Sequence, residues 1–147
     1  MKLSKFFLIT LIFGGVLTLK AQTENSQSEI VQIEKTLMNY IDGTANGEIE
    51  KLKKAFHPDF NLYTISNDSL RVRSGKKYID NVKKGKKSNR IGRIISIDYE
   101  NDAAIAKAEI LIPNWRIFTD YFLLMKYENS WKIVQKSYTY QPIPKAE

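Results

Sequence analysis

The sequence contains no cysteine and a single histidine, His57. The absence of cysteine excludes disulfides, thiolate metal ligands and a cysteine nucleophile, and one histidine cannot build a histidine-rich zinc site. We therefore predict no metal site and no bound cofactor. Proline is also scarce, with four in 147 residues. Two of them, Pro142 and Pro144, lie close together near the C-terminus, where they mark the end of the folded domain.

No apolar run is long enough to span a bilayer. The longest covers residues 6–19, about fourteen residues, against roughly 20 for a transmembrane helix. Lys2 and Lys5 precede it and the small Ala21 follows, which is the plan of a secretory signal peptide. An uncleaved membrane anchor is the alternative. We predict an exported protein, periplasmic or secreted, without a stable membrane span after cleavage. The expected boundaries are a signal peptide at 1–22, a polar leader at 23–28, one domain at 29–141 and a tail at 142–147.

Acidic residues are nearly absent from one segment. Residues 71–93 hold ten basic side chains and one acid, whereas the rest of the mature chain holds ten basic and fifteen acidic residues. This basic patch suggests an extracytoplasmic polyanion as a partner, although the solvated face of a helix would look the same. Nucleic acid is a poor candidate, because Tyr78 is the sole aromatic residue among the cations. The patch comprises Lys76, Lys83, Lys84, Lys86, Lys87 and Arg90 among its cations.

Hydrophobic periodicity predicts three helices. Ile33, Leu37, Tyr40 and Ile41 recur at helical spacing after Ser28, a residue suited to an N-cap. A short helix follows around residues 48–56, and Pro58 ends it. A third is expected at 75–85, with a glycine at its C-terminal end.

The rest of the sequence alternates as β-strands. We expect strands at 60–66 and 70–74, then four long strands from residue 90 to residue 140 that turn at short connections. Short connections make neighbouring strands antiparallel. The predicted fold class is therefore α+β, with helices on one face of a curved antiparallel sheet.

This order of elements resembles the nuclear transport factor two-like superfamily, whose cystatin-like cone fold is shared with ketosteroid isomerase and the SnoaL-like polyketide cyclases. The likeness is closest to the bacterial group named putative lumazine-binding proteins. It rests on "IEKTLMNYIDGTANGEIEKLKKAFHPDF", "VRSGKKYIDNV" and "FTDYFLLMKYENSWKIVQKSY". The resemblance implies a sheet wrapped around N-terminal helices, a pocket within it, and homodimers formed through the sheet. It does not imply one activity, because the superfamily includes enzymes, binders and assembly modules.

Strand alternation points to Asp120 as the acid of most interest. Pairing across the turn at 128–130 places Asp120 beside Tyr138, and it sets Phe122 and Leu124 on the same face as Val134. A carboxylate among aromatic rings can serve as an acid or base, but it more often accepts a structural hydrogen bond. His57 is a further candidate proton shuttle, although no spacing supports a dyad with Asp120.

The aromatic residues supply a candidate pocket lining for a small apolar or aromatic ligand. Such residues also build ordinary cores, and that alternative stays open. The lining expected from the sequence is Tyr40, Phe56, Phe60, Tyr63, Trp115, Phe118, Phe122 and Tyr140.

Three functions remain in competition at this point. The favoured one is an exported small-molecule-binding or structural domain that homodimerises through its sheet. The first alternative is an isomerase, dehydratase or cyclase using Asp120 and Tyr138. The second is a polyanion-binding protein using the basic patch.

Overall fold

The computed structural model describes residues 14–143. The chain divides into two compact units, the first ending at Val31 and the second beginning at Gln32. Helix α1 (Gly14–Asn46) begins upstream of the start expected at Ser28. No proline interrupts residues 14–46, so nothing in this stretch stops the helix. Residues 1–13 of the expected signal peptide lie outside the described residues, and the cleavage stays a prediction.

The second unit uses its helices as the sequence predicts. Ile33, Leu37, Tyr40 and Ile41 of α1 are buried. Helix α2 (Ile49–Ala55) follows after a tight turn, and helix α3 (Gly75–Asp80) is shorter than expected. The Ser74 side chain accepts a hydrogen bond from the Lys77 backbone N–H, which caps α3. Gly85 has a φ of 71° but lies in the loop beyond the helix.

Six strands form the sheet. They are β1 (Phe56–Ser66), β2 (Ser69–Ser74), β3 (Ile91–Glu100), β4 (Ala103–Ile112), β5 (Arg116–Tyr127) and β6 (Ser130–Pro142). Asn67 and Asp68 both adopt positive φ at the β1–β2 turn, as a two-residue hairpin requires. Glu128 and Asn129 do the same between β5 and β6.

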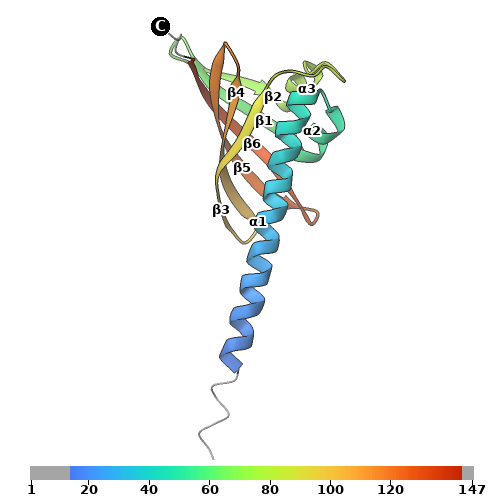
Figure 1. Cartoon of the computed structure of the whole chain (residues 1–147), viewed down its shortest axis with the longest axis vertical. Coiled ribbons are helices and arrows are strands. Elements are labelled where there is room, and N and C mark those ends of the chain that lie inside the picture. The colour runs from blue at the N-terminus through green and yellow to red at the C-terminus, as the bar shows by residue number, and fades with distance from the viewer. Residues whose placement is uncertain (1–13, 144–147) are drawn as a thin grey trace, which may run out of the picture. The chain divides into compact units, whose positions relative to one another are not determined.

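The strands lie in the order β2-β1-β6-β5-β4-β3. All neighbouring pairs are antiparallel except β1 with β6, which are parallel. The sheet is curved and unclosed (Figure 1). The expected α+β cone is therefore confirmed, with one parallel pair where only antiparallel pairs were predicted.

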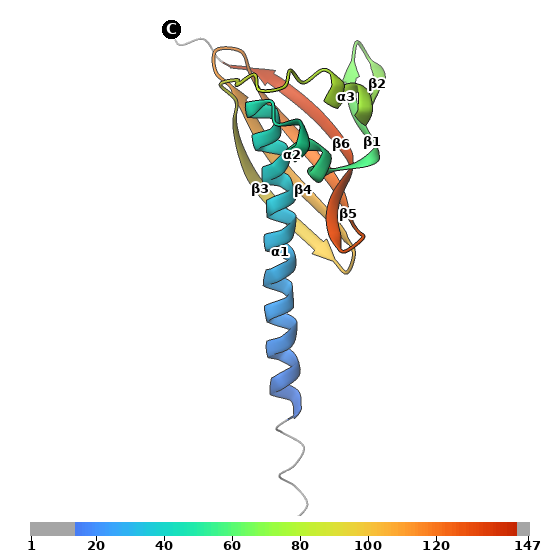
Figure 2. The same ribbon diagram turned by 90° about the vertical axis from the view of Figure 1, so that its right-hand side faces the viewer.

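The core lies between the helices and one face of the sheet (Figure 2). The side chains of β4 that face the helices are small, so the helices can pack close to this strand. They are Ala104, Ala106 and Ala108. At Gly92 of β3 a Cβ atom would lie 2.5 Å from Ile41 Cγ2, so this glycine permits the close approach of α1.

The register of β5 and β6 fixes the side chains that face this core. Asp120 lies opposite Tyr138, as expected. A bulge between Leu123 and Leu124 then shifts the pairing, so that Leu124 lies opposite Ile133. In a regular ladder Val134 would lie opposite Leu124. Because of the bulge it does not, so the expected shared face of Val134 and Leu124 is wrong.

Candidate functional site

A buried ion pair lies on the helix-facing side of the sheet. Lys136 Nζ of β6 is 3.0 Å from Asp120 Oδ1 of β5. Tyr40 Oη of α1 donates a hydrogen bond of 2.6 Å to Asp120 Oδ2, and Lys136 Nζ donates one of 3.0 Å to Tyr40 Oη. Asp120 is 0% exposed and Lys136 5%. The three polar groups thus satisfy one another inside the core.

Burial governs the ionisation of this triad. Desolvation lowers the pKa of Lys136 from its ordinary 10.5, and the positive charges of Arg90 and Arg73 act in the same direction. The Asp120 carboxylate opposes them by favouring the charged ammonium. Desolvation, and then the charge of Asp120, raise the pKa of Tyr40 well above 10.0. Tyr40 therefore keeps its proton and remains a hydrogen-bond donor.

A cavity of about 310 Å³ opens beside the triad, and we call it the aromatic cavity. The Lys136 ammonium lies 4.8 Å from the ring centroid of Tyr138, 5.0 Å from that of Tyr40 and 5.7 Å from that of Tyr78. These distances are typical of cation–π contacts. The other aromatic walls are Trp115, Phe118 and Tyr140, and Leu62 and Ile110 add aliphatic surface.

Three arginines also line the aromatic cavity, namely Arg73, Arg90 and Arg116. The Arg116 guanidinium carbon lies 4.0 Å from the ring centroid of Trp115 and 4.1 Å from that of Tyr140, so the group is held between two rings. Asp120 is the one acid among the lining residues, and Lys136 already compensates it. The cavity is therefore both aromatic and positively charged.

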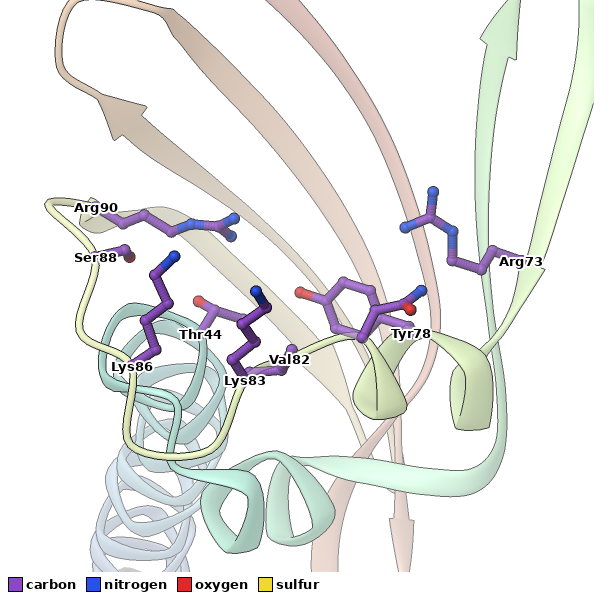
Figure 3. A pocket seen from close by; sticks show the side chains of 9 residues that line it. Thr44, Arg73, Tyr78, Val82, Lys83, Lys86, Ser88 and Arg90 are labelled. Carbon is purple, nitrogen blue, oxygen red and sulfur yellow. The ribbon is translucent and has the colours of Figure 1, made fainter.

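A second cavity of about 390 Å³ adjoins the first, and we call it the basic pocket. Both cavities include Arg73, Tyr78 and Arg90 in their walls. Lys83 and Lys86, from the loop between α3 and β3, complete the charged lining (Figure 3). The polar lining is Thr44, Asn81 and Ser88.

The structure sorts the aromatic residues expected at the pocket into three groups. Tyr40, Trp115, Phe118 and Tyr140 line the aromatic cavity, together with the candidate pair Asp120 and Tyr138. The second group lies in the core outside this lining: Phe56, Phe60 and Phe122, each at most 3% exposed. Tyr63 alone makes up the third group. It follows the buried Leu62 along β1, so its side chain points to the face of the sheet opposite the core.

The structure does not bring His57 to Asp120. The His57 ring contacts Tyr127, with 5.0 Å between ring centroids. Tyr127 lies seven residues from Asp120 along β5, which at about 3.3 Å per residue is roughly 23 Å. His57 Nδ1 accepts a hydrogen bond of 3.2 Å from the Asp59 backbone N–H. His57 therefore lies at the start of β1, directly after α2, and away from Asp120.

The basic patch is also divided. Lys83, Lys86 and Arg90 line the basic pocket. Lys76 instead pairs with Asp80 at 2.7 Å on the exposed side of α3. Lys84 and Lys87 are exposed and do not line the basic pocket. The patch is therefore a short helix face followed by a loop that contributes three cations to a concavity.

Lys136 and Arg116 were not among the site residues predicted from the sequence. Arg90 was predicted as part of the basic patch, and Arg73 lies in the same basic segment, but neither was predicted to line an aromatic cavity. A lysine within a strand is usually taken as solvent-facing. The alternation of β6 nevertheless places Lys136 on the same face as Tyr138 and Tyr140, which is the signal that could have found it. Arg116 directly follows Trp115 at the start of β5, but the pattern alone does not show that rings enclose its guanidinium.

The residues that the structure describes, 14–143, contain neither a metal site nor a membrane-spanning helix. No cluster of histidine or acidic residues in this range could hold a metal ion. None of its helices is long and apolar enough to cross a membrane.

A family model described as "Putative lumazine-binding" matches residues 28–139. A comparison with curated proteins finds no match.

Several solved structures share the fold. An NTF2-like protein of unknown function from Shewanella baltica OS155 is 25% identical with a TM-score of 0.69, and the match covers 79% of this chain and 96% of that one. One from Methylobacillus flagellatus KT is 28% identical with a TM-score of 0.68, covering 78% and 93%. A third, from Silicibacter pomeroyi DSS-3, is 19% identical with a TM-score of 0.70, covering 79% and 98%.

Proposed function

The chain belongs to the family described as "Putative lumazine-binding", and on this premise we propose that its aromatic cavity binds a small planar aromatic anion. The observation that carries the proposal is a cavity with six aromatic side chains in its walls and a net positive charge. The rings come from α1, α3, β5, β6 and the turn before β5. Its volume of about 310 Å³ is at the lower end of ligand sites and suits one or two fused rings.

The charged groups indicate which polar substituent the ligand carries. Arg73 and Arg90 have no ion-pair partner among the described residues, and neither has Arg116. Guanidinium groups bind carboxylates and similar planar anions through two parallel hydrogen bonds. An anionic ring compound would therefore use the rings for stacking and the arginines for its charge.

The geometry favours binding over acid–base catalysis at Asp120. Each carboxylate oxygen already accepts a hydrogen bond, Oδ1 from Lys136 and Oδ2 from Tyr40. A general base must instead be free to accept a proton from a substrate. In this proposal, Asp120 orients Lys136 and Tyr40 in the cavity wall, and Tyr138 contributes a ring.

Calorimetric titration of the mature protein tests this function. The probes are lumazine, which is a bicyclic heteroaromatic compound, 2-naphthoate and the uncharged 2-naphthamide. We expect 2-naphthoate to bind more tightly than 2-naphthamide. Arg116→Gln and Arg90→Gln should each weaken 2-naphthoate about tenfold, which corresponds to about 1.4 kcal/mol.

Lys53→Gln is the matched control, because it removes one positive charge from the exposed surface of α2. It should leave the affinity for 2-naphthoate unchanged. The proposal is wrong if no probe binds at millimolar concentration, or if the two arginine variants bind 2-naphthoate as tightly as the wild type.

Two further properties are part of the proposed function. The protein is exported, as the N-terminal sequence indicates, and it pairs with a second copy through the outer face of its sheet. That face carries Ile105 of β4, and Tyr121 and Leu123 of β5, each between 39% and 57% exposed. Ile105 and Leu123 are direct cross-strand neighbours, so they form one apolar surface.

A further inference from the structure

We infer that the basic pocket binds the phosphate group of a phosphorylated aromatic ligand whose ring occupies the aromatic cavity. This inference rests on the proposed function for the ring and adds the chemical class of the ligand, a phosphate monoester. The two cavities adjoin, because Arg73, Tyr78 and Arg90 line both of them. One molecule can therefore reach from one into the other.

Unpaired positive charge is concentrated around the basic pocket. Lys83, Lys86, Arg73 and Arg90 all line the basic pocket, and no acidic residue is part of its lining. None of these four side chains forms an ion pair with an acid of the described residues. Four like charges around one concavity repel each other, and an anion in the middle relieves that repulsion.

The basic side chains also point toward one another across the pocket. Figure 3 shows Lys83, Lys86 and Arg90 pointing into the same space from the loop side, while Arg73 faces them from β2. Lys84 and Lys87 belong to the same loop but are not part of the pocket lining. Only some of the lysines of this loop therefore face the pocket. A loop whose lysines served only to contact solvent would have no need of such an arrangement.

Backbone hydrogen bonds hold the loop that carries Lys83 and Lys86 in place without any ligand. The Gly85 N–H donates a hydrogen bond of 2.9 Å to the Gly47 carbonyl. The Ser88 N–H and Ser88 Oγ both donate to the Ala45 carbonyl, at 2.6 Å and 3.2 Å. These bonds attach the loop to the C-terminal end of α1, and a preorganised site loses less entropy on binding.

The number of donors favours phosphate over carboxylate in this pocket. A phosphate monoester carries close to two negative charges at neutral pH and three oxygens that point in different directions. Two guanidinium groups and two ammonium groups can contact those oxygens from opposite sides. A carboxylate has two coplanar oxygens and would leave part of these donors unused.

The test compares 2-naphthyl phosphate with 2-naphthoate on the mature protein by calorimetry. We expect the phosphate ester to bind at least about tenfold more tightly. In the double variant Lys83→Gln/Lys86→Gln this advantage should disappear, while the affinity for 2-naphthoate stays the same. The matched control Lys84→Gln/Lys87→Gln removes the same charge from the same loop and should keep the advantage.

Inorganic phosphate provides a readout that does not depend on the ring. Its titration should shift the backbone amide NMR signals of Gly85 and Ser88 in the wild type and in the control, but not in Lys83→Gln/Lys86→Gln. If 2-naphthoate binds and the phosphate ester has no advantage, the inference fails while the proposed function stands. If both double variants lose the advantage equally, the effect is long-range charge and the inference also fails. If phosphate shifts the amides and neither ring compound binds, the proposed function is wrong, and this inference with it.

Discussion

Lys136 places an ammonium group where few lysine side chains are found, inside the core and within 6 Å of three tyrosine rings. Its charge is tolerated because Asp120 and Tyr40 complete its hydrogen bonds. Buried ion pairs of this kind contribute little stability compared with apolar packing, yet breaking one partner alone is costly.

We predict strong coupling between Lys136 and Asp120. Lys136→Met should lower the free energy of unfolding by about 3–5 kcal/mol, because it leaves a buried carboxylate without its counter-charge. The double variant Asp120→Asn/Lys136→Met should cost less than Lys136→Met alone, since no buried charge remains. Urea denaturation of the wild type, Asp120→Asn, Lys136→Met and the double variant measures the coupling. Lys53→Met, at an exposed position, is the control, and additive costs of the two single changes would contradict the prediction.

The alkaline stability of the protein depends on Tyr78 and Tyr40. Burial, followed by the charge of Asp120, raises the pKa of both above 10.0. Above pH 10 an unfolded tyrosine loses its proton while the folded one keeps it, so the native state binds more protons and stability falls as pH rises. Lys136 affects the pH dependence of stability in the opposite direction. Its pKa is lowered in the folded state, so below pH 10.5 the unfolded state binds more protons and this contribution to stability rises with pH.

We therefore predict that Tyr78→Phe reduces the loss of stability between pH 10 and pH 11 by about 1 kcal/mol. The measurement is urea denaturation of the wild type and the variant at both pH values. Because each protein is compared with itself, any packing effect of the substitution cancels. Equal losses in the two proteins would show that Tyr78 does not retain its proton in this range.

At the scale of elements, one glycine allows the loop that carries Lys83 and Lys86 to pack against the turn after α1. Gly47 has a φ of 65°, and a Cβ there would contact the Lys83 carbonyl oxygen and lie 2.8 Å from the Lys86 amide nitrogen. The turn after α1 and the basic loop are thus packed backbone against backbone. Gly85 also has positive φ, but a Cβ there would meet nothing within 4 Å.

Gly47→Ala should therefore destabilise the protein more than Gly85→Ala. Both changes place an alanine in the left-handed region, at about 1–2 kcal/mol each, and only the first adds steric overlap with the loop. Thermal or urea unfolding of the two variants gives the comparison. Equal costs, or a larger cost at Gly85, would mean that the loop is not held against α1.

The sequence predicted the elements better than their pairing. Periodicity identified the buried face of α1 and the alternation of β5, because each pattern is local. The parallel pairing of β1 with β6 joins segments about 75 residues apart, and no local pattern encodes it. The bulge at Leu123 moved Ile133 opposite Leu124 for the same reason, since one extra residue in β6 changes every later partner.

The candidate site was predicted in part. Aromatic residues on the correct faces led to Tyr40, Phe118 and Tyr138, all of which line the aromatic cavity. The sequence identified Arg73 and Arg90 as part of a basic segment, but not as walls of the aromatic cavity. They belong to different elements, which meet only when β2 and the α3–β3 loop are in place. A basic residue in an isolated strand or loop has no feature that distinguishes a cavity wall from a solvated surface.

At the scale of the whole molecule, we predict a homodimer that forms through the outer face of β4 and β5. Size-exclusion chromatography with light scattering should give twice the mass of the mature chain. Leu123→Glu should yield a folded monomer, because it introduces a charge into the apolar surface. Leu70→Glu, at an exposed leucine of the edge strand β2, should leave the dimer intact. A monomeric wild type would contradict this prediction.

The position of β6 has a consequence for how the protein is made. This strand is the last along the chain that the structure describes, yet it lies between β1 and β5 in the middle of the sheet. Until the ribosome has released the residues up to 142, β1–β2 and β3–β5 have no strand to join them. The sheet therefore cannot be completed before β6 has left the ribosome. A chain whose sheet stays incomplete until this late strand is available suits a protein that we propose to be exported.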